Sequence, residues 1–300
     1  MDRLRIVKRS TLCYTIGKKE VARLKADCHI HMVLDGENWR EAIGRHSQCP
    51  DDGFIRQALA QYQAQGYTYL RDGGDRWGVG KRARELAPEY GITYRTPLSP
   101  LCKKGHYGSF IGTAYEDYKE FTGLVIRTKE ASGDFIKIMI SGLMDFDRFG
   151  VLTEEGLPER EIRELINIAH SQGLAVMVHA NGARAVEAAA AAGVDSVEHG
   201  AYLDKDAMEA MQAQGTVWVP TLSTIGNLRG TGRFSEENVE KILESALENL
   251  ANYKGFVAPG TDAGAWAVPH GIHTEETLLA AAGIDQDRLQ AGIKKIQQLF

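Results

Sequence analysis

The chain has 300 residues, of which 43% are hydrophobic and 25% charged, and its formal net charge is -5. This composition is ordinary for a soluble globular protein. The small negative charge gives no reason to expect nucleic acid or an anionic membrane as a partner, and no apolar run reaches the roughly 18 residues of a membrane span. We therefore expect a small-molecule substrate as the partner of this chain.

Residues 1–23 contain basic residues but lack the apolar core of a signal peptide, so we expect a short lead-in to the first element. The four cysteines are Cys13, Cys28, Cys49 and Cys102, and none of them forms a CxxC pair. Their wide spacing argues against a disulfide framework or a zinc ribbon. It fits a reducing compartment, so we expect a cytoplasmic protein.

Short apolar runs then alternate with charged segments of helical spacing. Eight runs predict strands: Leu24–Met32, Tyr67–Leu70, Ile92–Pro97, Phe135–Ile140, Ala175–Val178, Asp195–Glu198, Thr216–Leu222 and Phe256–Ala258. The segments that predict helices are Asp51–Gln65, Val79–Leu86, Tyr115–Glu130, Pro158–Gln172, Ala183–Ala192, Lys205–Gln214, Ser235–Tyr253, Glu275–Ala282 and Asp287–Phe300. Several helical segments are followed by a glycine, which tolerates the left-handed conformation that ends a helix: Gly66, Gly173, Gly193, Gly215 and Gly255.

Repeated strand–helix units predict an α/β fold with parallel strands, and eight of them predict a TIM-like (β/α)8 barrel. A doubly wound open sheet is the structural alternative, and it normally binds a nucleotide through a glycine-rich first turn. The first turn here, Val33–Gly36, lacks the GxGxxG pattern. We expect one barrel domain over residues 1–300, in which residues 283–300 form a helical tail.

Side chains that can bind a metal lie where several of these strands end, which is where barrels carry their active sites. His29 and His31 belong to the first strand, and their spacing places both imidazoles on one face. His179, His199 and Asp262 lie at the ends of the fifth, sixth and eighth strands. Imidazole and carboxylate ligands suit zinc and related divalent ions.

Lys137 lies inside the otherwise apolar fourth strand. A buried ammonium group is costly unless it is paired or neutralised. One explanation is an ion pair with a neighbouring carboxylate. The other is carbamylation by carbon dioxide, which would turn the lysine into an anion able to bridge two cations.

This ordered set of residues resembles the amidohydrolase superfamily of metal-dependent hydrolases. Its members have HxH on strand one, a carboxylated lysine on strand four, histidines on strands five and six, and an aspartate on strand eight. The strings Asp27–His31, Val197–Gly200 and Gly260–Gly264 are similar to the corresponding family motifs. Leu70–Gly74 and Pro269–Gly271 are most similar to the imidazolonepropionase-like and Xaa-Pro dipeptidase-like branch, which shares strings of the form VRDxGG and PHG.

The resemblance implies a binuclear centre of two divalent ions, with zinc as the first choice and manganese, iron or cobalt as alternatives. The residues that it implies as ligands are His29, His31, Lys137, His179, His199 and Asp262. The first two histidines and the aspartate would hold the more buried ion, the later histidines would hold the other, and a carboxylated Lys137 would bridge both. Asp262 would act as general base and then general acid in cleaving an amide-type C–N bond of a dipeptide, an N-acyl amino acid or a cyclic amide.

Other reactions at the same site stay open: lactone or ester hydrolysis, deamination, or metal binding without catalysis. A deaminase-like branch uses one metal, no strand-four lysine and an HxxE glutamate, whereas Ala-Asn-Gly follows His179 here and Lys137 is present. Residues 1–28 and 263–300 are too few for the β-sandwich that members commonly carry. We therefore expect at most a stub of that sandwich, and a homo-oligomer stays open.

The candidate substrate contacts are His106, Tyr107 and Arg71. The first two lie in the long loop after strand three, where a hydrogen bond that orders the loop is the alternative role. Arg71 follows strand two and could receive a substrate carboxylate, although pairing with Asp72 or Asp75 explains it equally well. Glu198 precedes His199, so strand alternation predicts that it faces the helices in an ion pair.

Overall fold

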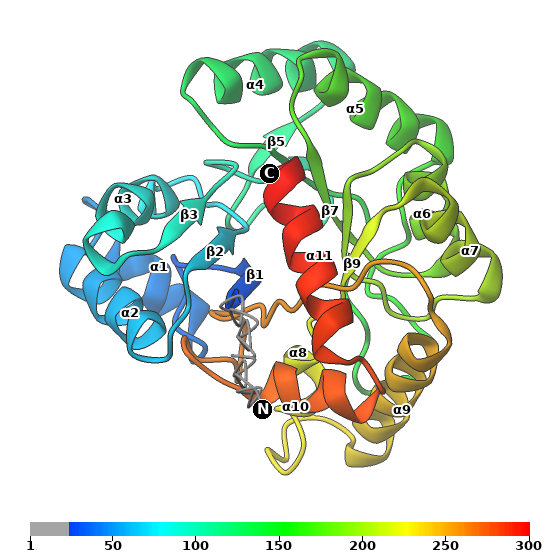
Figure 1. Cartoon of the computed structure of the whole chain (residues 1–300). Coiled ribbons are helices and arrows are strands. Elements are labelled where there is room, and N and C mark those ends of the chain that lie inside the picture. Colours follow the sequence, from blue (N-terminus) through cyan, green and yellow to red (C-terminus); the bar gives the residue numbers. More distant parts are fainter. Residues whose placement is uncertain (1–23) are drawn as a thin grey trace, which may run out of the picture.

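The computed structural model describes residues 24–300, so the predicted lead-in 1–23 lies outside the described residues. In the described part, parallel strands form a (β/α)8 barrel and the helices surround it (Figure 1). This confirms the predicted fold class. No helix of the described part combines the length and the apolar character needed to cross a membrane.

The strands alternate with helices as predicted, except that β3, β4 and β5 follow one another directly. The strands are β1 (Ala26–Ile30), β2 (Tyr69–Asp72), β3 (Thr93–Arg95), β4 (Leu101–Lys103), β5 (Thr113–Tyr115), β6 (Ile136–Met139), β7 (Val176–Ala180), β8 (Ser196–His199) and β9 (Val217–Val219). The helices are α1 (Trp39–Arg45), α2 (Asp52–Ala64), α3 (Val79–Leu86), the 3-10 helix η1 (Ala87–Tyr90), α4 (Tyr118–Glu130), α5 (Glu159–Ser171), α6 (Ala183–Ala191), α7 (Lys205–Gln214), α8 (Ser223–Gly226), α9 (Glu236–Asn252), α10 (Thr274–Ala281) and α11 (Gln286–Leu299).

The strands pair in two runs, β1-β2-β3 and β5-β4-β6-β7-β8-β9, and all the pairs are parallel. Single backbone contacts join the runs. β9 bridges to Val257, and the amide of Cys28 in β1 donates to the carbonyl oxygen of Pro259 at 2.8 Å. On the other side, the amide of Asp134 donates to the carbonyl oxygen of Thr96 at 2.9 Å.

The third and eighth barrel strands differ from the prediction. The third strand is interrupted between Pro97 and Pro100, and the chain then forms β4, which pairs with β6. Proline has no amide hydrogen to donate to a sheet ladder, which explains the interruption. The predicted strand Phe256–Ala258 is reduced to the isolated bridge of Val257. The strands β4 and β5, the helices α1 and α8 and the 3-10 helix η1 were not predicted.

Local signals fix most helix ends. Aspartate side chains accept a hydrogen bond from a backbone amide in the first turn of four helices: Asp51, Asp117, Asp204 and Asp285. Four of the five predicted terminal glycines have positive φ: Gly66, Gly173, Gly193 and Gly215. Gly255 does not, because α9 already ends at Asn252 and the next residue is extended.

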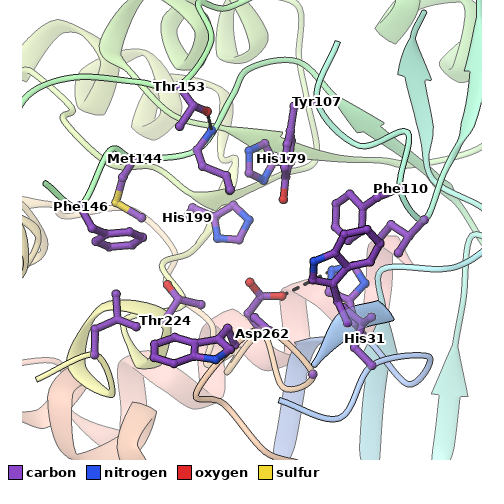
Figure 2. A pocket seen from close by; sticks show the side chains of 18 of the residues that line it. His31, Tyr107, Phe110, Met144, Phe146, Thr153, His179, His199, Thr224 and Asp262 are labelled. Carbon is purple, nitrogen blue, oxygen red and sulfur yellow. Dashed lines mark hydrogen bonds and ion pairs between the residues drawn. The ribbon is translucent and has the colours of Figure 1, made fainter. Parts of the chain in front are cut away.

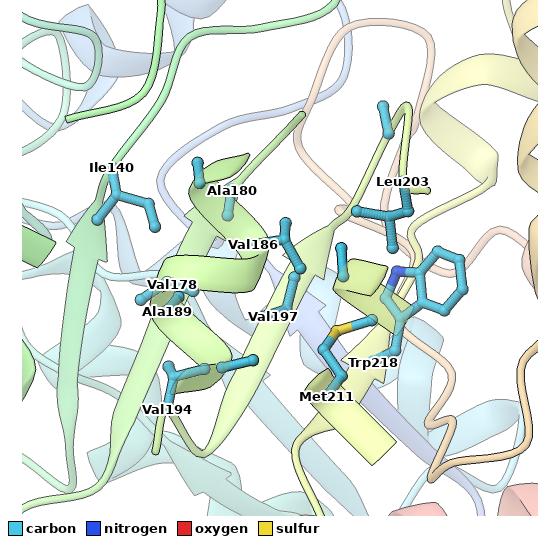
Figure 3. Close-up of a cluster of buried hydrophobic side chains, with 14 of the residues drawn as sticks. Ile140, Val178, Ala180, Val186, Ala189, Val194, Val197, Leu203, Met211 and Trp218 are labelled. Atoms are coloured by element: carbon cyan, nitrogen blue, oxygen red, sulfur yellow. The ribbon is translucent and has the colours of Figure 1, made fainter. Parts of the chain in front are cut away.

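The largest apolar cluster lies between the second half of the barrel and its helices. Val186 and Ala189 of α6 pack against Val178 and Val197 of β7 and β8 (Figure 3). Trp218 of β9 is fully buried, and its indole Nε1 donates to the carbonyl oxygen of residue 199 at 2.9 Å. The core therefore holds the end of β8 in place.

Helix α11 closes the end of the barrel at which the strands begin (Figure 1). Its residues Ile293 and Ile296 pack against side chains that include Ala26 and Tyr69 at the starts of β1 and β2. A Cβ atom added at Gly292 would lie 1.9 Å from the carbonyl oxygen of Val257. The helix can approach the barrel backbone this closely only because residue 292 is glycine.

Gly292→Ala should therefore lower the free energy of unfolding by about 1–3 kcal/mol, because the added methyl group overlaps backbone atoms. Gly44→Ala in α1 is the matched control, since an added Cβ there meets nothing within 4 Å. It should leave stability unchanged or raise it by up to about 1 kcal/mol. Urea unfolding of both variants measures the difference, and equal stabilities would contradict the close approach of α11.

Candidate metal centre

A cavity of about 870 Å³ opens at the ends of the barrel strands (Figure 2). Five of the six predicted ligands line it: His31, Lys137, His179, His199 and Asp262. The sixth, His29, is completely buried next to them. The structure thus brings together residues that are separated by up to 233 positions in the sequence, 29 to 262.

Three of these side chains converge on one point. The Nε2 atoms of His29 and His31 are 3.3 Å apart, and each lies 3.4 Å from Oδ1 of Asp262. Ligand atoms about 2.1 Å from a tetrahedral zinc ion lie about 3.4 Å from one another. The triangle therefore has the size of three corners of a zinc coordination tetrahedron, and the residues present fit such an ion.

The other two histidines lie beside this triangle. The His199 ring is 5.2 Å from the His29 ring and 4.5 Å from the His179 ring, measured between centroids. Nδ1 of His199 contacts the Thr221 hydroxyl at 2.7 Å, which leaves Nε2 for a ligand. Nε2 of His179 lies 3.1 Å from the carbonyl oxygen of Gly142. An ion at His179 would have to replace that contact or bind through Nδ1.

The backbone positions Asp262 against the first strand. Its amide donates to the carbonyl oxygen of His29 at 2.7 Å. The buried carboxylate of Asp27 accepts hydrogen bonds from the amide of Thr261 at 2.9 Å and from its hydroxyl at 2.6 Å. Asp262 has φ +58, a left-handed conformation that a residue other than glycine adopts at a cost. The hydrogen bonds of Asp27 to Thr261 stabilise this strained turn.

Burial shifts the pKa values of the side chains at the candidate metal centre. Desolvation lowers the pKa of His31 and of His179 to about 3, so both imidazoles are neutral at pH 7, as metal ligands must be. Desolvation also lowers the pKa of Lys137 to about 8 and raises the pKa of Asp262 to about 7. Lys137 Nζ has no hydrogen-bond partner among residues 24–300.

Glu198 faces the barrel interior, so the prediction that it faces the helices was wrong. Its Oε2 lies 2.9 Å from Nδ1 of His29, and its Oε1 accepts hydrogen bonds from Arg71 Nη2 at 2.8 Å and from the Ser196 hydroxyl at 2.6 Å. Strand alternation points residues 196 and 198 inward, and His199 has φ +69, which turns it inward as well. The sequence alone gave no sign of this left-handed residue.

Arg71 belongs to the same buried network and does not line the cavity. Its Nε donates to the carbonyl oxygen of Cys28 at 2.7 Å, and its guanidinium lies 4.5 Å from the ring centroid of Phe300. In this structure it is therefore out of reach of a substrate in the cavity. Arg71 pairs with Glu198 and not with Asp72 or Asp75, the partners that were considered from the sequence.

The two loop candidates have different surroundings. Tyr107 lines the cavity, and its ring centroid is 4.8 Å from that of His179. His106 does not line the cavity, and its Nδ1 contacts a carboxylate oxygen of Glu154. The alternative role considered for this loop, a contact that orders it, therefore fits His106, whereas Tyr107 is placed to touch a bound molecule.

The fold and the site define a (β/α)8-barrel protein with a candidate metal centre of histidines and a carboxylate. The sequence profile of the amidohydrolase family matches residues 27–291. The chain therefore belongs to the amidohydrolase family.

Individual relatives agree with this assignment. Ochratoxinase from Aspergillus niger is 27% identical over 281 residues, which cover 78% of this chain and 55% of ochratoxinase. The chain thus spans about half the length of this curated relative. A crystal structure of a Xaa-Pro dipeptidase with bound methionine has a TM-score of 0.70 at 21% identity, covering 92% of this chain and 75% of the dipeptidase. The structure of A. niger ochratoxinase has a TM-score of 0.69 at 20% identity, covering 90% of this chain and 69% of that one. These structures share the fold.

The buried network around Glu198 can be tested by its effect on stability. Arg71→Met leaves the Glu198 carboxylate buried without its cation, which should lower the free energy of unfolding by about 3–5 kcal/mol. Arg56→Met removes an exposed ion pair with Glu89 and is the matched control. The control should unfold at nearly the same urea concentration as the unmodified protein. An equally small effect of Arg71→Met would show that the buried pair does not support the barrel.

Proposed function

We propose that this protein is a metal-dependent hydrolase that cleaves an amide-type C–N bond with two divalent ions and a carboxylated lysine. The observation that carries the proposal is the triangle of Nε2 of His29, Nε2 of His31 and Oδ1 of Asp262, with sides of 3.3 to 3.4 Å. The similarity to a Xaa-Pro dipeptidase supports an amide bond as the target.

The residues of the triangle would hold the more buried ion, and His179 and His199 would hold the other. Bound divalent ions would lower the pKa of water and polarise a substrate carbonyl. Asp262 borders the cavity, so its carboxylate is placed to take a proton from the attacking water. The protonated carboxyl group can then pass the proton to the leaving amine nitrogen.

The bridging role of Lys137 is supported by the surroundings of its amine. The side chain lines the cavity and is 1% exposed, and Nζ has no hydrogen-bond partner among the described residues. An ion pair, the other explanation for a buried lysine, therefore lacks a contacting partner within residues 24–300. Carbamylation replaces the unpaired ammonium with an anion, whose two oxygens would have cations as partners.

Metal analysis tests the ligand set directly. The purified protein should contain about two divalent ions per chain, and His179→Ala should lower this number to about one because one ion loses a ligand. His170→Ala is the control, since His170 lies in α5 and pairs with Asp195 outside the cavity.

Asp262→Asn should reduce amide hydrolysis at least about 100-fold through loss of the base. Metal-free protein that gains no activity with zinc or manganese would refute the proposal.

Carbamylation of Lys137 can be detected by carbon NMR after incubation with isotope-labelled bicarbonate. The unmodified protein should show one carbamate resonance, and Lys137→Met should lack it while retaining the fold by circular dichroism. Lys129→Met is the control, because the Lys129 ammonium is exposed and donates to the carbonyl oxygen of Gln172. It should retain the resonance. A resonance that persists in Lys137→Met would assign the carbamate to another amine.

A further inference from the structure

The cavity is large and its walls are aromatic. Its volume of about 870 Å³ lies in the upper part of the roughly 300–1,000 Å³ range of small-molecule sites. Six aromatic side chains line it: Trp39, Tyr107, Phe110, Phe146, Phe234 and Trp266. A site of this size and composition favours a bulky ligand with a large planar apolar part.

One wall is a continuous row of rings from the rim to the candidate metal centre. Trp39 is 5.6 Å from Phe110, Phe110 is 5.9 Å from Tyr107, and Tyr107 is 4.8 Å from His179, between ring centroids. Figure 2 shows Tyr107 and Phe110 on one side of the site and Phe146 on the other. A planar group lying along this row would place an attached amide next to the centre.

The opposite wall adds a cation. Phe146 is 5.2 Å from Phe234, and Phe234 is 6.3 Å from Trp266. The guanidinium of Arg233 lies 4.0 Å from the Trp266 ring centroid and 5.4 Å from that of Phe234. Contact with two rings restrains this exposed side chain before a ligand arrives, which lowers the entropy lost on binding.

Arg233 forms no ion pair with a carboxylate of residues 24–300 and lines the cavity. The nearby carboxylate of Asp145 is already held by Arg148, whose Nε lies 2.7 Å away. On the other rim, Arg40 stacks on Trp39 but is accompanied by the cavity-lining carboxylate of Glu37. Neither guanidinium group forms an ion pair within residues 24–300, and we choose Arg233 because two rings of the cavity wall hold it, whereas one ring holds Arg40.

We infer that the cavity accepts amides that join a large aromatic group to a carboxylate-bearing part, and that Arg233 binds the carboxylate. The aromatic group stacks on the row formed by Tyr107, Phe110 and Trp39. This inference rests on the proposed amide hydrolysis and adds the substrate class to it. N-aroyl amino acids are the simplest compounds of this class.

Binding can be measured without turnover by using sulfonamides, in which a sulfonyl group replaces the carbonyl group of the amide to be cleaved. The probes are N-naphthylsulfonyl-L-alanine, its methylsulfonyl analogue without the aromatic group, and N-ethylnaphthalenesulfonamide, which lacks the carboxylate and has no carbonyl group. Isothermal titration of the metal-loaded protein gives the three dissociation constants. Loss of the naphthyl group should weaken binding at least about tenfold, and loss of the carboxylate should weaken it about three- to tenfold.

The role of Arg233 follows from repeating the titrations on Arg233→Gln. The acid and the carboxylate-free probe should then bind within about twofold of each other, because the partner of the carboxylate is gone. Arg229→Gln removes the same charge from the same loop, at a residue that pairs with Glu240 and does not line the cavity. This control should keep the full preference for the acid. A preference that persists in Arg233→Gln, or disappears in Arg40→Gln instead, would overturn the assignment.

Hydrolysis assays separate this inference from the proposed function. N-naphthoyl-L-alanine should have a lower KM than N-acetyl-L-alanine, and Arg233→Gln should raise its KM with little change in kcat. Equal kcat/KM for both amides would refute the inference and leave amide hydrolysis standing. Naphthyl- and Arg233-dependent binding without hydrolysis of either amide would refute the proposed function and support the ligand class.

Discussion

The contact between the first and eighth barrel strands determines where the candidate metal centre lies. Asp27 binds both donors of Thr261, and the amide of Asp262 binds the carbonyl oxygen of His29. These bonds place a carboxylate from the end of the chain against two histidines near its beginning. The eighth strand has little ladder pairing of its own, so side-chain and single backbone contacts replace it. The contacts that close the barrel are therefore the same contacts that bring these candidate ligands together.

The barrel interior next to the centre contains buried charged side chains above an apolar cluster. Arg71, Glu198 and Lys137 are almost fully buried, and such charges persist only where partners compensate them. Arg71 and Glu198 compensate each other, and Glu198 also fixes the orientation of the His29 ring through Nδ1. Lys137 has no comparable partner within the described residues. The interior therefore contains a complete ion pair, Arg71 with Glu198, which stabilises the fold. It also contains Lys137, whose amine has no partner within residues 24–300.

The sequence was sufficient for features that depend on local pattern or on barrel topology. Aspartate caps, terminal glycines and alternating apolar runs specify most elements, and the rule that strand ends converge brings His29, His179 and Asp262 together. Features that depend on an unusual backbone conformation or on an interrupted strand were not predicted. The left-handed conformation of His199 turns it to the same side as the inward-facing Glu198, and the interruption between Pro97 and Pro100 creates an additional strand. Arg71 was misjudged because its partner lies 127 residues away.

The candidate metal centre and the walls of the cavity belong to different parts of the fold. The candidate ligands lie on or directly after strands, whose geometry is shared by all barrels of this kind. The rings around the cavity come from α1 and from four separate connections: Tyr107 and Phe110 after β4, Phe146 after β6, Phe234 after α8 and Trp266 after α9. Each connection can change without disturbing the strands. The candidate metal centre is therefore encoded in the barrel strands, whereas the lining of the cavity is encoded in connections that lie far apart in the sequence.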